Sequence, residues 1–223
     1  MKLTCIIPCY KQAEFLPDAI ESALQADEVI VIDDGSPDAS AQIASHYPVK
    51  LIRQVNKGLA SARNTGIMNA SGDYILPLDS DDILMDGAVE SIKKAIEVTN
   101  ADIIAPSFKT FGLRSQSVIL DAVPKLSDFF TANRIGYFSA VRKSALLEIG
   151  GYNPKMTFGW EDYDLWIDLL KRGKTIATIT ETLVLYRIKE ISMITEANKH
   201  AIDLANQMRR NHPEFPELFI QNA

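Results

Sequence analysis

The sequence predicts an α/β fold: one domain built on a mainly parallel sheet flanked by helices, with more mixed β structure in its second half. In the first half, short β-branched runs alternate with stretches of helical apolar spacing, the pattern of βαβ units. The 223 residues are 47% hydrophobic, enough for a large core. We find no linker-like stretch and no internal repeat, so we expect a single domain.

In the first half, strands and helices alternate in order. Residues 3–8 are an apolar run expected as a buried strand, and apolar residues recur at helical spacing over 13–25. A β-branched strand at 28–33 is stopped by the turn residues 34–37. The remaining elements expected here are a helix at 39–46, a strand at 49–53, a helix at 60–70 and a strand at 74–78.

The second half is less regular. A helix is expected over 86–98, where Asp86 suits an N-cap, and a short strand at 103–104. The other elements expected are a hairpin within 107–120, a strand at 136–141, a helix at 161–172, an extended segment at 177–187 and a polar helix at 197–210.

Composition limits the function classes. Asp and Glu outnumber Lys and Arg by 29 to 23, and no basic stripe interleaved with aromatics occurs, which argues against a nucleic-acid partner. No apolar run approaches the roughly 20 residues that span a bilayer. We expect a cytosolic chain and leave peripheral membrane association open. Cys5 and Cys9, four apart on a strand, are too distant to pair, so we expect both to pack as small hydrophobes.

Three polar segments should meet at one edge of the sheet. Residues 8–10, 33–36 and 79–82 each follow directly after a predicted strand. In parallel α/β sheets, ligands bind in the crevice beyond the carboxyl ends of the strands. The sequence therefore predicts a ligand site at that edge.

The segment 79–82 is the most acidic of the three. Two carboxylates about 5 Å apart repel by roughly 3 kcal/mol at an effective dielectric near 20. A bound Mg²⁺ or Mn²⁺ removes the repulsion, and it lets an acidic protein hold a phosphorylated ligand. We favour metal binding for Asp79 and Asp81, with capping of the following helix as the alternative.

Two further segments suit a nucleotide ligand. Asp33 and Asp34 could accept hydrogen bonds from a ribose hydroxyl or a base N–H; an Asx turn satisfied by its own backbone is the alternative. Lys57 and Arg63 flank a glycine and a helix start, which suits diphosphate contact. A solvated helix surface is equally compatible with Lys57.

The segment 158–164 opens a helix with three carboxylates. Carboxylates in a first turn complement the helix dipole, which is the simplest explanation for them. The preceding Phe-Gly-Trp could form an apolar wall for an acceptor, and a carboxylate beside it could act as a general base.

Taken together, these motifs resemble those of a known family. Pro-Cys-Tyr at 8–10, Val-Ile-Asp-Asp-Gly-Ser-Pro-Asp at 31–38, Asn-Lys-Gly-Leu-Ala-Ser-Ala-Arg-Asn-Thr-Gly at 56–66, Gly-Asp-Tyr-Ile-Leu-Pro-Leu-Asp-Ser-Asp-Asp at 72–82 and Gly-Trp-Glu-Asp-Tyr-Asp-Leu-Trp at 159–166 follow in order. The match over residues 3–190 resembles family 2 glycosyltransferases of the GT-A fold, which have a Rossmann-like sheet. Five motifs in order make this resemblance highly specific.

The resemblance implies an inverting, non-processive transfer. A sugar would move from a nucleoside-diphosphate donor, UDP by default, to a hydroxyl of a glycan or lipid-linked acceptor, with Mn²⁺ or Mg²⁺ as cofactor. Residues 1–100 would form the nucleotide-binding half, 101–190 the acceptor half and 191–223 a C-terminal helical tail. The oligomeric state is not predicted.

The resemblance also implies roles for single residues. Asp162 would be the catalytic base, with Glu161 beside it, and Asp81 would bind the metal. Asp79 would lie near the metal or ribose. The residues expected to bind the nucleotide sugar are Pro8, Tyr10, Glu14, Asp33, Asp34, Lys57, Arg63, Asp79 and Ser80. The residues expected near the acceptor are Trp160 and Arg187.

Two positions depart from the family pattern. Lys11 stands where asparagine is common, and Lys189 stands where the Tyr-Arg-X-His stretch often has histidine. The Gln-X-X-Arg-Trp signature of processive relatives is absent. Three alternatives remain: a nucleotidyltransferase, which would need a Gly-rich basic segment after the first strand; a receiver-like or phosphatase domain; and a nucleotide-sugar-binding subunit without activity.

Overall fold

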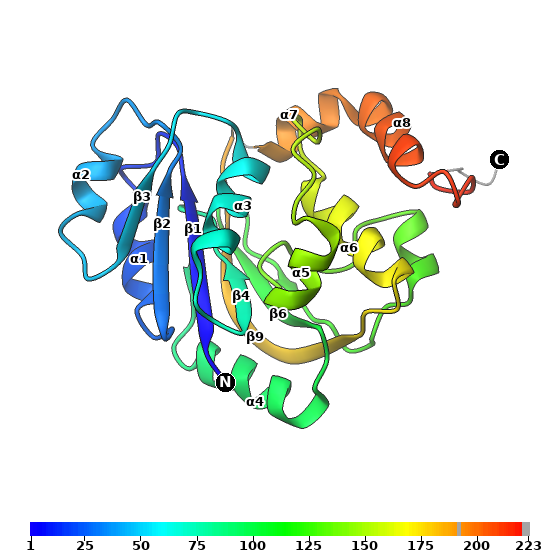
Figure 1. The fold of residues 1–223 in the computed structure, drawn as a ribbon, viewed down its shortest axis with the longest axis horizontal. Coiled ribbons are helices and arrows are strands. Elements are labelled where there is room, and N and C mark those ends of the chain that lie inside the picture. Colours follow the sequence, from blue (N-terminus) through cyan, green and yellow to red (C-terminus); the bar gives the residue numbers. More distant parts are fainter. Residues whose placement is uncertain (191–192, 220–223) are drawn as a thin grey trace.

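Nine strands form one mixed sheet in the computed structural model, which describes residues 1–190 and 193–219 (Figure 1). Its first four strands are parallel neighbours: β1 (Leu3–Cys9), β2 (Glu28–Asp33), β3 (Lys50–Arg53) and β4 (Tyr74–Pro77). The later strands are β5 (Ile83–Leu84), β6 (Ile103–Gly112), β7 (Ser117–Val118), β8 (Ala140–Arg142) and β9 (Ile176–Ile188). The order is β3-β2-β1-β4-β8-β6-β9-β5, with β7 paired to β6.

Antiparallel pairing begins at β8, which joins β4 to β6. In Figure 1 the blue and cyan first half and the green to red second half lie side by side, with the sheet running through both. The predicted fold class, a mainly parallel sheet with mixed β structure in the second half, is confirmed.

Helices cover both faces of the sheet. They are α1 (Leu16–Ala23), α2 (Ser40–Ala44), α3 (Leu59–Asn69), α4 (Ala88–Thr99), α5 (Lys143–Ile149), α6 (Glu161–Lys171), α7 (Met193–Lys199) and α8 (Ala201–Asn211), with a 3-10 turn, η1, at Leu126–Phe130. Side chains of α1 and α4 enter one core cluster, and side chains of α3, α5, α6 and α8 enter the other.

Strand alternation separates the two clusters. In β1, Cys5 and Ile7 point into the cluster of α1 and α4, whereas Ile6 points into the cluster of α3 and α6. Successive side chains of a strand face opposite ways, so a strand buried on both faces is apolar throughout. Cys5 and Cys9 are free and buried, as expected for small hydrophobes.

Several predicted elements need correction. The expected helix at 197–210 is two helices, α7 and α8, with the break at His200. The expected strand at 136–141 is only Ala140–Arg142, and α5, η1 and β5 were not predicted. The hairpin within 107–120 is confirmed by the pairing of β6 with β7. Parts of the predicted tail, residues 191–192 and 220–223, lie outside the described residues.

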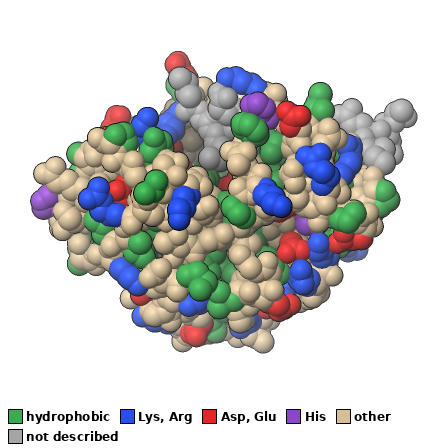
Figure 2. Space-filling view, turned by 45° about the horizontal axis from the view of Figure 1, so that its top comes forward, with side chains coloured by type: hydrophobic (Ala, Val, Ile, Leu, Met, Phe, Trp, Pro, Cys, Tyr) green, Lys and Arg blue, Asp and Glu red, His purple; other side chains and the backbone are tan. Residues whose placement is uncertain are grey.

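Charge is spread over the surface. On the face that Figure 2 presents, Lys and Arg side chains are scattered among acidic and apolar ones. Among the described residues, no helix combines the length and apolar character needed to cross a bilayer.

Candidate active site

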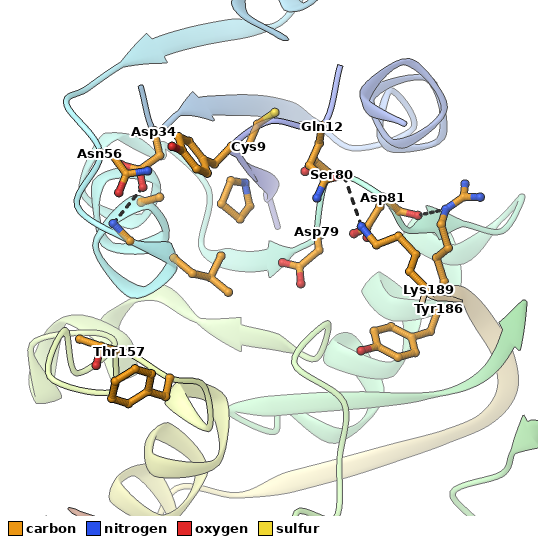
Figure 3. Close-up of a pocket in the computed structure, with 17 residues that line it drawn as sticks. Cys9, Gln12, Asp34, Asn56, Asp79, Ser80, Asp81, Thr157, Tyr186 and Lys189 are labelled. Carbon is orange, nitrogen blue, oxygen red and sulfur yellow. Dashed lines mark hydrogen bonds and ion pairs between the residues drawn. The ribbon is translucent and has the colours of Figure 1, made fainter. Parts of the chain in front are cut away.

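The carboxyl ends of β1, β2 and β4 meet at one edge, as predicted, because the three strands are parallel neighbours. A cavity of about 620 Å³ opens there. The sequence-predicted residues that line it are Pro8, Tyr10, Asp34, Asp79, Ser80, Asp81 and Arg187. We name this cavity the donor-side pocket, after the role that the sequence predicts for it. Figure 3 shows Asp34 and Asn56 on one side of the pocket, Asp79 near its middle and Asp81 with Lys189 on the other side.

A tight turn presents the acidic segment. The Asp82 N–H donates to the Asp79 carbonyl at 3.1 Å, which closes the turn directly after β4. The Tyr137 hydroxyl accepts a hydrogen bond from the Asp79 N–H at 2.9 Å and donates to a carboxylate oxygen of Asp82. The other Asp82 oxygen accepts from the Arg187 N–H at 2.6 Å. Asp82 therefore holds the turn in place, while Asp79 and Asp81 face the pocket.

Arg63 connects this turn to α6. Its side chain is only 1% exposed. One guanidinium nitrogen donates to Asp79 at 2.7 Å, and another donates to Glu161 at 2.5 Å. The rings of Tyr137 and Tyr152 lie within cation–π distance of the guanidinium. Arg63 was predicted to contact a diphosphate; the structure instead buries it as the link between Asp79 and Glu161, because α3 packs between the acidic turn and the start of α6.

Burial changes the proton affinity of the acidic turn. The pKa of Asp79 is raised to about 6, chiefly because burial removes its hydration; Arg63 opposes this rise, and the charge of nearby Asp81 adds to it. Burial, with the charges of Asp79 and Asp81, raises the pKa of Asp82 well above its usual range. Asp82 therefore has a structural role, and the hydrogen bonds that it accepts on both oxygens stabilise its buried carboxylate.

The two carboxylates after β2 have different positions. Asp33 accepts a hydrogen bond from the Ser36 N–H at 2.9 Å and pairs with Arg53 at 3.2 Å, and it does not line the pocket. This is the turn that the sequence offered as the alternative to ligand binding. Asp34 lines the pocket and accepts from the backbone N–H groups of Lys57 and Gly58, both at 2.9 Å.

Asp34 thereby fixes the loop that begins α3. Two other predicted donor contacts lie elsewhere: the side chains of Glu14 and Lys57 are exposed and do not line the pocket. Lys57 meets Asp34 through its backbone N–H, and its side chain is exposed.

A second cavity, of about 370 Å³, adjoins the first. The two cavities share Leu59, Asp79 and Tyr186. The second, which we name the α6-side pocket, is lined by Trp160, Glu161 and Asp162 at the start of α6. Trp160 caps that helix with a φ of 61°, a left-handed conformation that non-glycine residues adopt rarely. Asp79 thus stands between the two cavities.

Asp162 and Glu161 differ in their surroundings. Glu161 is 5% exposed, and its carboxylate forms an ion pair with Arg63. Asp162 is partly exposed toward the α6-side pocket, and its carboxylate accepts one hydrogen bond from the Asn133 side chain at 2.8 Å. Burial, together with the charge of Glu161, raises the pKa of Asp162 to about 7. A carboxylate with a pKa near neutrality can accept a proton at physiological pH.

Arg187 belongs to the donor-side pocket, not to the pocket of Trp160. Its guanidinium lies between the rings of Phe15, at 4.5 Å, and Phe111, at 4.3 Å. Its Nε donates to the carbonyl of Asp81 at 2.8 Å. The sequence placed Arg187 with the acceptor; the antiparallel pairing of β5 with β9 instead brings it against the acidic turn.

The residues around Asp81 do not fit a resident divalent cation. Lys189 Nζ lies 2.5 Å from the Asp81 carboxylate, and Arg63 occupies one oxygen of Asp79. Within the described ranges, no group of three His, Cys, Asp or Glu side chains is arranged to hold a metal. A cation bound to Asp81 would have to displace an ammonium. This donor set therefore gives no support to the predicted Mn²⁺ or Mg²⁺ site.

Four contributors were missed at the sequence level: Asn133, Tyr137, Tyr186 and Lys189. Tyr186 and Lys189 had been noted only as part of a family stretch. Asn133 comes from 107–135, where no motif stands out, and Tyr137 lies in the strand expected at 136–141, which suggested no site role. Asn133, Tyr137 and Lys189 each meet a carboxylate partner 29 or more positions away in the sequence, and Tyr186 lines both cavities. Contacts of this kind are set by the tertiary structure and leave no local signal.

Comparison with known proteins finds relatives in sequence and in fold. The model of Glycosyl transferase family 2 matches residues 4–150. Glycosyltransferase GlyA of Streptococcus pneumoniae is 35% identical over 119 residues, 49% of this chain and 17% of the relative. The uncharacterized glycosyltransferase EpsJ of Bacillus subtilis is 35% identical over 115 residues, 48% of this chain and 33% of the relative. The chain thus spans a third or less of the length of these two relatives.

A solved structure resembles nearly the whole chain. The crystal structure of S. aureus TarS in complex with UDP-GlcNAc superimposes with a TM-score of 0.82 over 99% of this chain and 68% of that chain, at 19% identity. At this identity the likeness concerns the fold alone. It confirms the GT-A fold expected from the sequence.

Proposed function

Because the chain belongs to glycosyl transferase family 2, we propose that it transfers a sugar from a nucleoside-diphosphate donor to an acceptor hydroxyl, with inversion at the anomeric carbon. One observation carries the proposal. A pocket at the carboxyl ends of the parallel strands adjoins a second pocket that contains a carboxylate with a pKa of about 7, and Asp79 lies between them.

The donor-side pocket suits the nucleotide. A cavity of about 620 Å³ lies within the size range of small-molecule sites. The Tyr10 ring is 41% exposed at its wall and offers a face on which a base can stack. Asp34 anchors the backbone that begins α3, and α3 starts at the pocket wall with Leu59. We assign the nucleoside to Tyr10, Pro8 and Asp34, with UDP the expected nucleotide, because TarS binds UDP-GlcNAc on the same fold.

The α6-side pocket suits the acceptor, a glycan or lipid-linked hydroxyl. In the proposed step the acceptor oxygen attacks the anomeric carbon from the face opposite the diphosphate. Asp162 takes the hydroxyl proton as the new carbon–oxygen bond forms. The bond from the anomeric carbon to the phosphate oxygen breaks, and its electron pair leaves with the diphosphate.

Glu161 is a positioning residue in this scheme, since its carboxylate is held by Arg63 and leaves Asp162 as the free acceptor of a proton. Trp160 lines the pocket beside Asp162 and offers an apolar face for a sugar ring. A divalent cation is left out of the step, because its predicted ligand Asp81 is paired with Lys189.

The test is release of nucleoside diphosphate from a panel of nucleotide sugars, measured with the purified chain and with Asp162→Asn. Release by the wild type and its loss in the variant, with donor affinity unchanged in a thermal-shift titration, are the expected results. If neither release nor donor-induced stabilisation occurs with any nucleotide sugar, the proposal is wrong. Stabilisation without release by either protein would favour the inactive binding subunit.

A further inference from the structure

Lys189 follows directly after β9 and reaches the acidic turn at a place that the pairing of β5 with β9 determines. Ile83 pairs with Leu185 in that antiparallel ladder, so the residues before β5 oppose the residues after Leu185. Lys189 and Asp81, 108 positions apart in the sequence, meet with Nζ 2.5 Å from a carboxylate oxygen. Figure 3 shows the Lys189 ammonium beside Asp81 at the side of the pocket.

The ion pair between Lys189 and Asp81 is partly buried in the wall of the pocket. The Lys189 and Asp81 side chains are 24% and 18% exposed, and both line the donor-side pocket. The stem of Lys189 is held near the Phe15 ring, 5.2 Å from Nζ, and Gln12 Oε1 lies 3.3 Å from the same nitrogen. An ammonium has three N–H donors. Among the described residues, Asp81 and Gln12 account for two, which leaves one for a ligand in the pocket.

The three carboxylates of the turn are each compensated from within the chain. Asp79 is paired with Arg63, Asp81 with Lys189, and Asp82 accepts from Tyr137 and from the Arg187 N–H. The repulsion that would otherwise demand an added cation is therefore already relieved. A diphosphate in the pocket would meet the Lys189 ammonium beside Asp81 and not an uncompensated carboxylate.

We propose that the Lys189 ammonium supplies the positive charge that faces the donor diphosphate at Asp81, so that donor binding needs no divalent cation. This inference rests on the proposed function, because it presumes a nucleoside-diphosphate donor. The ammonium contacts the phosphate oxygens and neutralises the charge that gathers on the diphosphate as it leaves. In this chain the lysine takes the place that the family pattern often gives to histidine.

The experiment measures binding of UDP, GDP, ADP and dTDP by calorimetry and thermal shift, in EDTA and in Mn²⁺. For the wild type, we expect the preferred nucleotide to bind with the same affinity in both. Lys189→Ala should weaken binding in EDTA by about 10- to 100-fold, the loss expected for a hydrogen bond between charged groups. Lys189→His should bind weakly in EDTA and regain affinity in Mn²⁺, because imidazole and carboxylate together suit that ion.

Lys93→Ala is the matched control. Lys93 forms a comparable ion pair with Asp27, at 2.6 Å and 27% exposed, on α4 away from the pocket. The Lys93→Ala variant should bind nucleotide with the same affinity as wild type. Melting temperatures without nucleotide separate loss of fold from loss of contact. Lys189→Gln provides a second variant, which removes the charge but keeps a polar side chain with N–H donors, and it should also weaken binding in EDTA.

The outcomes separate the two proposals. If the wild type binds nucleotide only in Mn²⁺, or if Lys189→Ala binds as well as wild type in EDTA, the role of Lys189 is refuted while the donor assignment stands. If none of the four nucleotides binds in either condition, the proposed function fails, and this inference fails with it.

Discussion

Replacing Asp162 with Asn removes one negative charge at the start of α6 while conserving the shape of the side chain. The amide oxygen can still accept the hydrogen bond from Asn133 that the carboxylate accepts at 2.8 Å. Two quantities should change independently: the rate of sugar transfer and the free energy of unfolding.

The magnitudes follow from the raised pKa. A general base contributes about 100- to 10,000-fold to a rate, so transfer should fall by that factor. A pKa raised from 3.8 to about 7 corresponds to roughly 4 kcal/mol in a site without water. The partial exposure of Asp162 reduces this to about 2 kcal/mol. Because folding disfavours the charged form, Asp162→Asn should be more stable than wild type by about 2 kcal/mol at pH 8.

The raised pKa of Asp162 also determines how the free energy of unfolding changes with pH. Between the unfolded value of 3.8 and the folded value of about 7, the folded state holds more protons, so this group lowers stability as pH rises through that window. The gain in Asp162→Asn should therefore be complete above pH 7 and shrink toward pH 4. Wild-type transfer should rise with pH through about 7, as the base loses its proton.

Urea unfolding at pH 5 and pH 8 measures the first effect, and nucleotide release across the same range measures the second. Asp168→Asn on the same helix is the control, since Asp168 pairs with Lys171 and Arg172 at the surface and should give no gain at pH 8. Retention of more than about a tenth of wild-type transfer would refute the base assignment. Equal stabilities of Asp162→Asn and wild type at pH 8 would refute the burial argument.

Three further predictions concern the frame of the site. Arg63→Met should lower the free energy of unfolding, measured by urea titration, by about 3–5 kcal/mol, because it leaves the carboxylates of Asp79 and Glu161 without their cation. A loss below about 1 kcal/mol would contradict this. Tyr137→Phe removes the donor to Asp82 and should cost about 1–3 kcal/mol by thermal unfolding; an unchanged stability would mean that the hydroxyl is dispensable. Gly35→Ala places a methyl 2.9 Å from a backbone nitrogen at a φ of 74°, whereas Gly58→Ala meets no atom within 4 Å at a φ of 85°. Gly35→Ala should therefore lower the melting temperature more than Gly58→Ala, and the reverse order would show that backbone strain outweighs contact.

Some site residues were predictable because their signal is local. Asp34, Asp79 and Asp81 each follow a buried strand within a few positions, and parallel strands bring such ends to one edge. Asp162 stands at the start of a helix whose apolar spacing is plain. For these residues a short stretch of sequence fixes both the element and its end.

Other predictions failed because a side chain has several available partners and only packing chooses among them. Lys57 and Arg63 share a loop and a helix start, yet one is exposed and the other is 1% exposed between two carboxylates. The break at His200 was equally hidden, since no Gly or Pro marks it in the sequence. Arg187 was expected beside Trp160 but lines the other cavity, because the pairing of β5 with β9 is not visible in either segment.

The sequence by itself determined the parallel strands of the first half, the edge where their polar ends meet and the family to which the chain belongs. These follow from periodicity and from motifs a few residues long, which the backbone converts directly into strands, turns and helix starts. The tertiary structure alone decided which cation faces which carboxylate: Arg63 for Asp79 and Glu161, and Lys189 for Asp81. Ion pairs of this kind join residues many positions apart, and their partners are chosen by the crossing of strands and the exclusion of water, which no local pattern records.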